Sequence, residues 1–205
     1  VSSPGLIANN FMSIGGNGVA RGIYMTGSSY YNILNNNFHI TNTHTGQSIG
    51  VPMYLTSNPS LKVYNNNFSN AGVGYGIYAN NNTSFLADYN NYYVLGSQIG
   101  YWNGTARTTL SDWQSSTGQD LNAIEINPQF MSDSDLHVSN VLLNGAGLFQ
   151  ALVTQDIDGE SRQNPPDIGA DEFDPSIAND AGVFMAVGPH APFAHGSQPI
   201  DIAIK

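Results

Sequence analysis

The sequence has no cysteine, which excludes disulfides, thiol chemistry and thiolate metal sites. Charged residues are scarce: they make up 10% of the 205 residues, against roughly 25% in typical soluble domains. No run of about 18 apolar residues occurs, so we expect no membrane insertion. Polarity comes instead from Asn, Ser, Thr and Gly, while the 40% of hydrophobic residues are enough for a core.

Acidic residues are absent from the first part of the chain. No Asp or Glu precedes Asp88, and residues 1–87 carry only two basic side chains, Arg21 and Lys62. The formal net charge of −10 therefore arises in the rest of the chain. A protein without clustered Lys and Arg is poorly suited to phosphate binding, so we expect no nucleic-acid partner. The asymmetry also indicates two regions of different character.

An asparagine-rich motif repeats through the first half. "ANNF" ends at Phe11, "NNNF" ends at Phe38 and at Phe68, and "YNNYY" places Tyr92 in the same role. A second motif recurs between these copies, as "GIYM" at 22–25, "PMYL" at 52–55, "GIYA" at 76–79 and "IGYW" at 99–102. Short β-like runs broken by Gly and Asn, with no helical periodicity, predict a stacked β-solenoid.

Alternation within the second motif predicts which side chains face the core. Ile23 and Met25 should point inward and Tyr24 outward. Inward positions in later units would be Met53, Leu55, Ile77 and Ala79. The asparagines should supply left-handed corners and stack into a hydrogen-bonded amide ladder, since Asn tolerates positive φ. The Phe after each triplet should turn inward and stack on the next coil.

The second half carries a more distinctive pattern. "INPQFMSDSDLHVSNVLLNGAG" at 126–147 and "DIDGESRQNPPDIGADEF" at 156–173 resemble the end of the choice-of-anchor secreted bacterial surface proteins. The repeats resemble those of the pectate-lyase-like superfamily, in a branch without catalysis. One stretch departs from the family pattern, because "NVLLNGAG" replaces the usual "SPAIDAG". The resemblance implies secretion and a right-handed parallel β-helix, and no single activity.

The predicted fold is therefore all-β, in three parts. Residues 1–125 form about four or five coils of a right-handed parallel β-helix (a solenoid). Residues 126–173 form a C-terminal closing segment, in which "PDIGADEF" adds a strand that covers the end of the solenoid. Residues 174–205 form a linker and the first strand of an Ig-like domain, because the chain ends in the alternating "PIDIAIK". Further domains of the same polypeptide are expected partners.

The outward tyrosines are the candidate ligand-binding surface. Tyr24, Tyr54, Tyr78 and Tyr101, with Trp102 nearby, would form a flat aromatic strip suited to sugar faces. The alternative is a ladder that only shields the sheet.

A calcium site is the candidate metal site. Asp156, Asp158 and Glu160 in "QDIDGESR" are its possible ligands, although the pattern lacks the third ligand and the distant Glu of an EF-hand loop. The alternative is a tight Asp-Gly turn, with Arg162 paired to a nearby carboxylate such as Asp167 or Asp171. We expect no other cofactor.

Catalysis within this chain is not expected. Before Asp88 the repeats have no carboxylate, and lyases and hydrolases need carboxylates or bases across a groove. "GQSIG" at 46–50 matches a nucleophile-elbow pattern by chance, because no helix is expected after it. His39 and His44 are expected in one surface loop, where a weak metal site is a minor alternative.

Three functions remain open at this point. The first is a non-catalytic structural or adhesive module of a bacterial cell-surface protein, in contact with extracellular polysaccharide or other surface proteins. The second is the C-terminal part of a polysaccharide lyase or glycoside hydrolase whose catalytic coils lie upstream. The third is a capping and targeting segment of a type IX secretion cargo. All three place the protein outside the cell.

Overall fold

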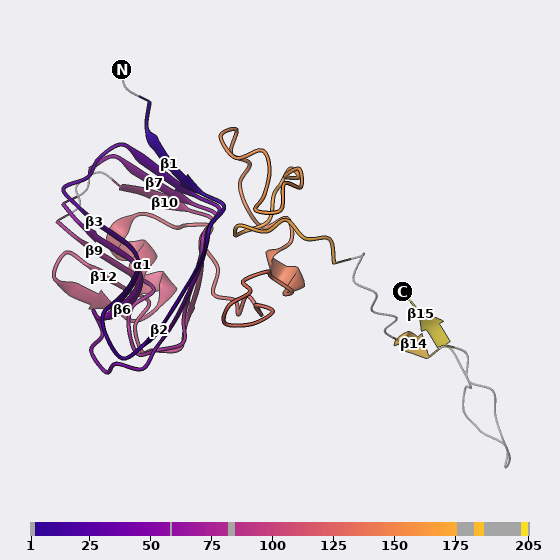
Figure 1. The fold of residues 1–205 in the computed structure, drawn as a ribbon, viewed down its shortest axis with the longest axis horizontal. Coiled ribbons are helices and arrows are strands. Elements are labelled where there is room, and N and C mark those ends of the chain that lie inside the picture. Colours follow the sequence, from indigo (N-terminus) through magenta and orange to yellow (C-terminus); the bar gives the residue numbers. More distant parts are fainter. Residues whose placement is uncertain (1–2, 58, 82–84, 176–182, 187–201, 205) are drawn as a thin grey trace, which may run out of the picture. The chain divides into compact units, whose positions relative to one another are not determined.

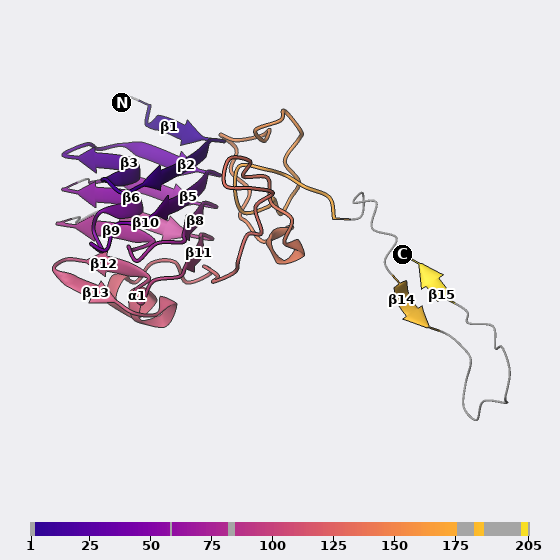
Figure 2. The ribbon, with the colours of Figure 1, turned by 60° about the horizontal axis from the view of Figure 1, so that its bottom comes forward.

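The computed structural model describes residues 3–57, 59–81, 85–175, 183–186 and 202–204. The chain divides into two compact units, residues 1–173 and 174–205. The first unit is a parallel β-solenoid with one short helix (Figure 1), so the predicted all-β solenoid is confirmed. Figure 2 shows its coils stacked from β1 at one end to β12 and β13 at the other.

Each coil gives one strand to each of three sheets. The first sheet has the order β1-β4-β7-β10 and contains β1 (Gly5–Ala8), β4 (Tyr31–Leu34), β7 (Leu61–Tyr64) and β10 (Phe85–Asp88). The second has the order β2-β5-β8-β11 and contains β2 (Phe11–Gly16), β5 (Asn37–Asn42), β8 (Asn67–Asn70) and β11 (Asn91–Val94). The third contains β3 (Ala20–Thr26), β6 (Gly50–Thr56), β9 (Ile77–Asn80), β12 (Gly100–Trp102) and the antiparallel β13 (Thr105–Arg107).

The core follows the predicted alternation. The predicted inward residues Ile23, Met25, Met53, Leu55, Ile77 and Ala79 are all buried, whereas Tyr24 is exposed. Phe38 and Phe68 stack with ring centroids 5.3 Å apart, and Tyr92 continues the stack at 5.2 Å. The prediction for Phe11 is wrong. Because "ANNF" has one asparagine fewer than "NNNF", Met12 lies in register with Phe38, and Phe11 lies in register with Asn37.

The asparagine corners between the first and second sheets have the predicted geometry. Asn9, Asn35, Asn65 and Tyr89 occupy equivalent corners and have φ between 51° and 56°. The next residue of each corner forms the asparagine ladder, which consists of Asn10, Asn36, Asn66 and Asn90 and ends at Asp120. Each Nδ2 donates to the Oδ1 of the next member, at 2.8 Å, 2.9 Å, 3.0 Å and finally 2.8 Å to Asp120. The predicted amide ladder is therefore confirmed.

A helix absent from the sequence prediction covers the last coil. Thr109 caps the N-terminus of α1 (Leu110–Thr117), and Gly118, at φ 67°, ends it in the left-handed conformation. The fully buried Trp113 packs on the core and donates from Nε1 to Asp120 Oδ2 at 2.8 Å. Eight residues are too few for a clear apolar period, which is why the pattern was missed. No helix in the described ranges is long and apolar enough to cross a membrane.

The closing segment, residues 126–173, lies along the corners of the solenoid rather than over its end. Figure 2 shows this segment in orange beside the stacked coils. The predicted strand in "PDIGADEF" is absent, since its backbone bonds to the asparagines: Gly169 N donates to Asn65 O at 2.8 Å, and Asn67 Nδ2 donates to Ile168 O at 3.0 Å. The 3-10 helix η1 (Val141–Leu143) is its only helical turn in the described range.

A buried ion pair fixes the closing segment internally. Arg162 Nη1 donates to Glu172 Oε2 at 3.1 Å, and the two side chains are 1% and 4% exposed. Arg162 therefore pairs with a nearby carboxylate, as expected, but the partner is Glu172 rather than Asp167 or Asp171. Arg162 Nη2 also reaches Asn9 Oδ1 at 3.0 Å, which ties this pair to the first corner of the solenoid.

The second unit contains two short described strands. β14 (Val183–Ala186) pairs antiparallel with β15 (Ile202–Ile204). β15 coincides with the strand predicted from "PIDIAIK". Residues 187–201 lie outside the described residues, and the Ig-like assignment stays a prediction.

Candidate functional site

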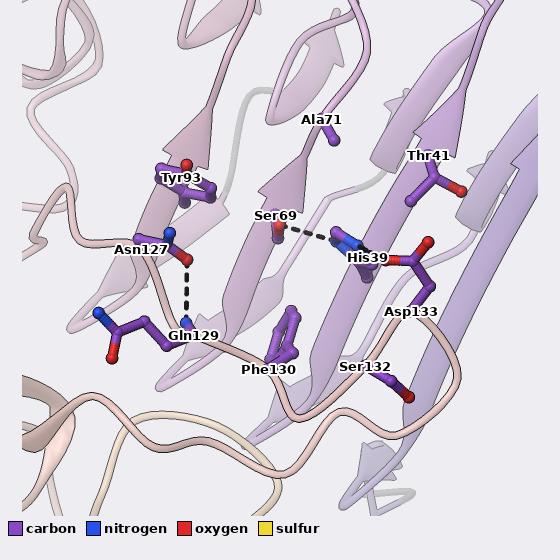
Figure 3. Close-up of a pocket in the computed structure, with 10 residues that line it drawn as sticks. All are labelled: His39, Thr41, Ser69, Ala71, Tyr93, Asn127, Gln129, Phe130, Ser132 and Asp133. Atoms are coloured by element: carbon purple, nitrogen blue, oxygen red, sulfur yellow. Dashed lines mark hydrogen bonds and ion pairs between the residues drawn. The ribbon is translucent and has the colours of Figure 1, made fainter.

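A groove of about 410 Å³ lies over the outer face of the second sheet (Figure 3). Its floor is formed by side chains of the sheet and the residue after β8, namely His39, Thr41, Ser69, Ala71 and Tyr93. Its wall is a loop of the closing segment that contributes Asn127, Gln129, Phe130, Ser132 and Asp133. We call this site the groove.

The repeat itself produces the row of side chains on the floor. Ser13, His39, Ser69 and Tyr93 occupy one register row through β2, β5, β8 and β11. Each follows an inward aromatic residue or Met12 in the chain, so alternation turns the row outward. The prediction that His39 lies in a surface loop is wrong, because the residue belongs to β5.

A chain of hydrogen bonds crosses the groove. His39 Nδ1 lies 2.9 Å from Ser69 Oγ, and His39 Nε2 lies 3.2 Å from Asp133 Oδ1. The Phe130 ring packs at a steep angle to the His39 ring, with centroids 5.4 Å apart. Ser13 Oγ also donates to the Asp133 carbonyl, which holds the loop against the sheet. Figure 3 shows the side chains of His39, Ser69, Phe130 and Asp133 close together in one space.

The groove offers mostly uncharged polar groups beside two aromatic rings. Thr41, Asn127 and Gln129 supply hydroxyl and amide groups, and Tyr93 and Phe130 supply the rings. Hydroxyl and amide groups can donate and accept hydrogen bonds, and the aromatic edges and faces pack against C–H groups. A ligand with many hydroxyls matches this chemistry. Sequence reasoning missed the groove because its wall comes from residues further along the chain than its floor, 94 positions further in the case of Asp133 and His39.

The predicted tyrosine strip has a different geometry from a sugar-binding platform. Tyr24, Tyr54, Tyr78 and Tyr101 lie in register and form what we call the tyrosine column. Tyr78 is stacked between Tyr54 and Tyr101, with centroid distances of 4.1 Å and 4.5 Å and planes within 3°. Both faces of the Tyr78 ring are therefore covered by its neighbours.

Two neighbours complete the tyrosine column. The Arg21 guanidinium carbon lies 3.7 Å from the ring centroid of Tyr54, a cation–π contact that covers this ring further. Burial and the neighbouring phenols, above all Tyr54, raise the pKa of Tyr78 to about 12. Trp102 is not part of the column: it lies in register with Ala79 and packs against the core.

The structure separates the three predicted calcium ligands. The Asp156 carboxylate accepts backbone N–H bonds from Asp158 at 3.0 Å, Glu160 at 2.7 Å and Glu172 at 3.0 Å. Its lone pairs therefore hold a tight turn around Gly159, as in the alternative interpretation. Glu160 is exposed and contributes no ligand to the one metal-compatible group found in the described residues, whereas Asp158 does.

Asp158 instead joins a histidine that sequence reasoning did not single out. Its Oδ2 lies 2.8 Å from His137 Nε2, and the Asp135 carboxylate is hydrogen bonded to His137 Nδ1. Burial opposes protonation of the ring, but the hydrogen bonds with Asp135 and Asp158 outweigh it and raise the pKa of His137 to about 8. The ring also packs edge-on against Phe11 at 4.9 Å.

Comparison with protein-family models, curated proteins and solved structures gives no match to this chain. The solenoid is therefore established by the chain's own structure. The resemblance to choice-of-anchor surface proteins stays a prediction.

Proposed function

We propose that this chain is a non-catalytic, glycan-binding module of a secreted bacterial surface protein, with the groove as its binding site. The single observation that carries the proposal is the groove itself. Its volume of about 410 Å³ falls in the range of small-ligand sites, and its lining combines hydroxyls, amides and two aromatic rings. Secretion and the cell surface rest on the resemblance of residues 126–173.

The rest of the solenoid supports a rigid scaffold for that site. His39 and Ser69 on the floor lie in strands that are paired on both sides, and the wall is held by Ser13 and His39 through Asp133. A preformed site loses little conformational entropy on binding. The tyrosine column is a weaker candidate, because the ring faces of its central members Tyr54 and Tyr78 are already covered.

The test is an oligosaccharide-array screen of the purified chain with Tyr93→Ala and Gln129→Ala. Each variant should weaken binding about tenfold or more, since each removes a wall or floor contact. Tyr24→Ala is the matched control, an outward tyrosine on another sheet, and should bind within twofold of wild type. Loss of binding in Tyr24→Ala alone would move the site to the tyrosine column, and an array without any hit would refute the proposal.

One observation favours a second candidate function, hydrolysis of an acyl ester. Ser69, His39 and Asp133 are linked in the order of nucleophile, base and orienting carboxylate. Ser69 is, however, 1% exposed and lies in a regular strand, so binding ranks first. Covalent labelling of Ser69 by a fluorophosphonate, absent in Ser69→Ala, would establish this activity, and an unlabelled Ser69 would exclude it.

A further inference from the structure

Three potential metal ligands converge in the closing segment. His137, Asp158 and Asp171 each offer a nitrogen or oxygen atom, and these atoms lie within 4.8 Å of one another. They come from three stretches far apart in the sequence, which only the folded closing segment brings together. We propose that His137, Asp158 and Asp171 bind a divalent transition-metal ion such as Zn²⁺.

Each ligand is held in place by a second group. Val138 N donates to Asp171 Oδ2 at 3.1 Å, and the turn that carries Asp158 is fixed by the Asp156 carboxylate. The His137 ring is positioned by Phe11 of β2. Supporting contacts of this kind orient ligands before a metal arrives.

The charge of the cluster calls for a cation. Asp171 is 6% exposed, and among the described residues no hydrogen bond reaches its Oδ1. Within the same part of the chain, no Lys or Arg pairs with Asp135, Asp158 or Asp171. Three carboxylates therefore face a single imidazole, and even one positive charge on that ring leaves the cluster with an excess of negative charge, which is costly at the buried Asp171. A divalent ion supplies the compensating charge.

The ligand types select the class of metal. Imidazole suits Zn²⁺, Co²⁺ and Ni²⁺, whereas Ca²⁺ takes oxygen ligands almost exclusively. The site thus differs from the predicted calcium site in both position and metal, and shares with it only Asp158. The side chains of Asp158 and His137 are 53% and 38% exposed, so an ion can reach them from solvent.

The expected consequence is a metal-stabilised closing segment. The ion would tie residues 135–138, 156–160 and 167–173 to each other beside β2. Binding to the folded state alone raises the unfolding temperature in proportion to the logarithm of the metal concentration. This inference does not depend on glycan binding, since the cluster and the groove share no residue.

The experiment is titration of the chelator-treated full chain with Zn²⁺ by calorimetry, and with Co²⁺ by visible absorption. One equivalent should bind, and the unfolding temperature should rise by about 5 °C at saturation. Asp158→Asn should weaken binding at least about tenfold, as loss of a ligand does. The matched control is Glu160→Gln, which removes an exposed carboxylate from the same turn and should bind within twofold of wild type.

The variants also test the alternative that a proton alone neutralises the cluster. Asp158→Asn removes an exposed oxygen and should leave the circular dichroism spectrum unchanged, so its effect is separable from misfolding. His137→Gln should abolish the Co²⁺ absorption bands. Absence of saturable binding in wild type, or equal binding in wild type, His137→Gln and Asp158→Asn, would overturn the proposal.

Discussion

The asparagine ladder and the tyrosine column run through the same coils in the same register, yet their surroundings are opposite. Asn36, Asn66 and Asn90 are fully buried, and every amide is hydrogen bonded. The tyrosines lie on the outer face, where Tyr24 is 56% exposed. Both repeats are equally visible in the sequence. Repetition in the sequence therefore identifies equivalent positions in successive coils. Burial determines how much the residues at those positions contribute to the stability of the fold.

The largest expected effect comes from breaking the ladder at Asn66. Its Nδ2 donates to Ile33 O, Tyr64 O and Asn90 Oδ1, and its Oδ1 accepts from Asn36. Asn66→Ala leaves several buried polar groups unpaired, at about 1–3 kcal/mol each, so we expect a loss of about 4 kcal/mol. Urea denaturation measures this loss in the free energy of unfolding. Asn17→Ala, at an exposed asparagine, should change the free energy of unfolding by less than about 0.5 kcal/mol.

A second large effect is expected where the closing segment meets the ladder corners. A Cβ at Gly169 would lie 2.3 Å from Asn37 Oδ1, and its φ of +116° disfavours other residues. Gly169→Ala should cost about 3 kcal/mol through overpacking and backbone strain. It should also make residues 126–173 more sensitive to limited proteolysis. Gly18→Ala, in open space, is the control, and equal sensitivity of both variants would contradict the docking described above.

The ladder also predicts that the free energy of unfolding depends on pH. Burial raises the pKa of Asp120 to about 6, against the hydrogen bonds from Asn90, Trp113 and Tyr92. Because this pKa lies above that of an unfolded Asp, the folded state binds the proton more tightly, and stability falls as the pH rises from about 4 to 6. The loss should be about 2 kcal/mol.

Asp120→Asn separates this contribution from others. The pKa of Asp167 is also raised, to about 7 by burial, and it acts in the same direction. The difference between wild type and Asp120→Asn in thermal unfolding from pH 4 to pH 7 therefore reports Asp120 alone. An unchanged slope in the variant would show that Asp120 titrates normally.

The smallest effect is expected in the tyrosine column. Tyr54→Ala removes two ring contacts and the cation–π contact with Arg21, all on the outer face. We expect a loss of about 1 kcal/mol in urea denaturation, as for exposed aromatic contacts. A loss as large as that of Asn66→Ala would mean that the column, like the ladder, holds the coils together.

Local repetition made much of the fold predictable. Positive φ at Asn35 and Asn65, the amide ladder and the inward Phe38 and Phe68 all follow from residues repeated at the same place in each coil. Where a unit departs from the pattern, the prediction failed: "ANNF" lacks one asparagine, and Met12 took the place given to Phe11.

Long-range docking set the limit of sequence reasoning for the site. The groove needs Asp133 beside His39, and the proposed metal site needs Asp171 beside His137. Neither of these pairs lies at a periodic spacing, so local propensity and alternation carry no information about them. The tyrosines were located correctly, but their ring orientation depends on stacking between coils.

The contacts of the closing segment are matched to the number of coils in the solenoid. This segment hydrogen bonds to the first three corner residues and to one strand residue of the last coil: Gln155 and Arg162 at Asn9, Gly169 at Asn35, Leu148 at Asn65, and Ile126 at Asn91 of β11. The asparagine ladder alone would be compatible with an inserted or deleted coil, because each Asn makes the same hydrogen bonds to its neighbours. The closing segment would not, since its own contacts are spaced for the coils that are present. Gain or loss of a repeat by duplication or deletion thus requires a matching change in residues 126–173.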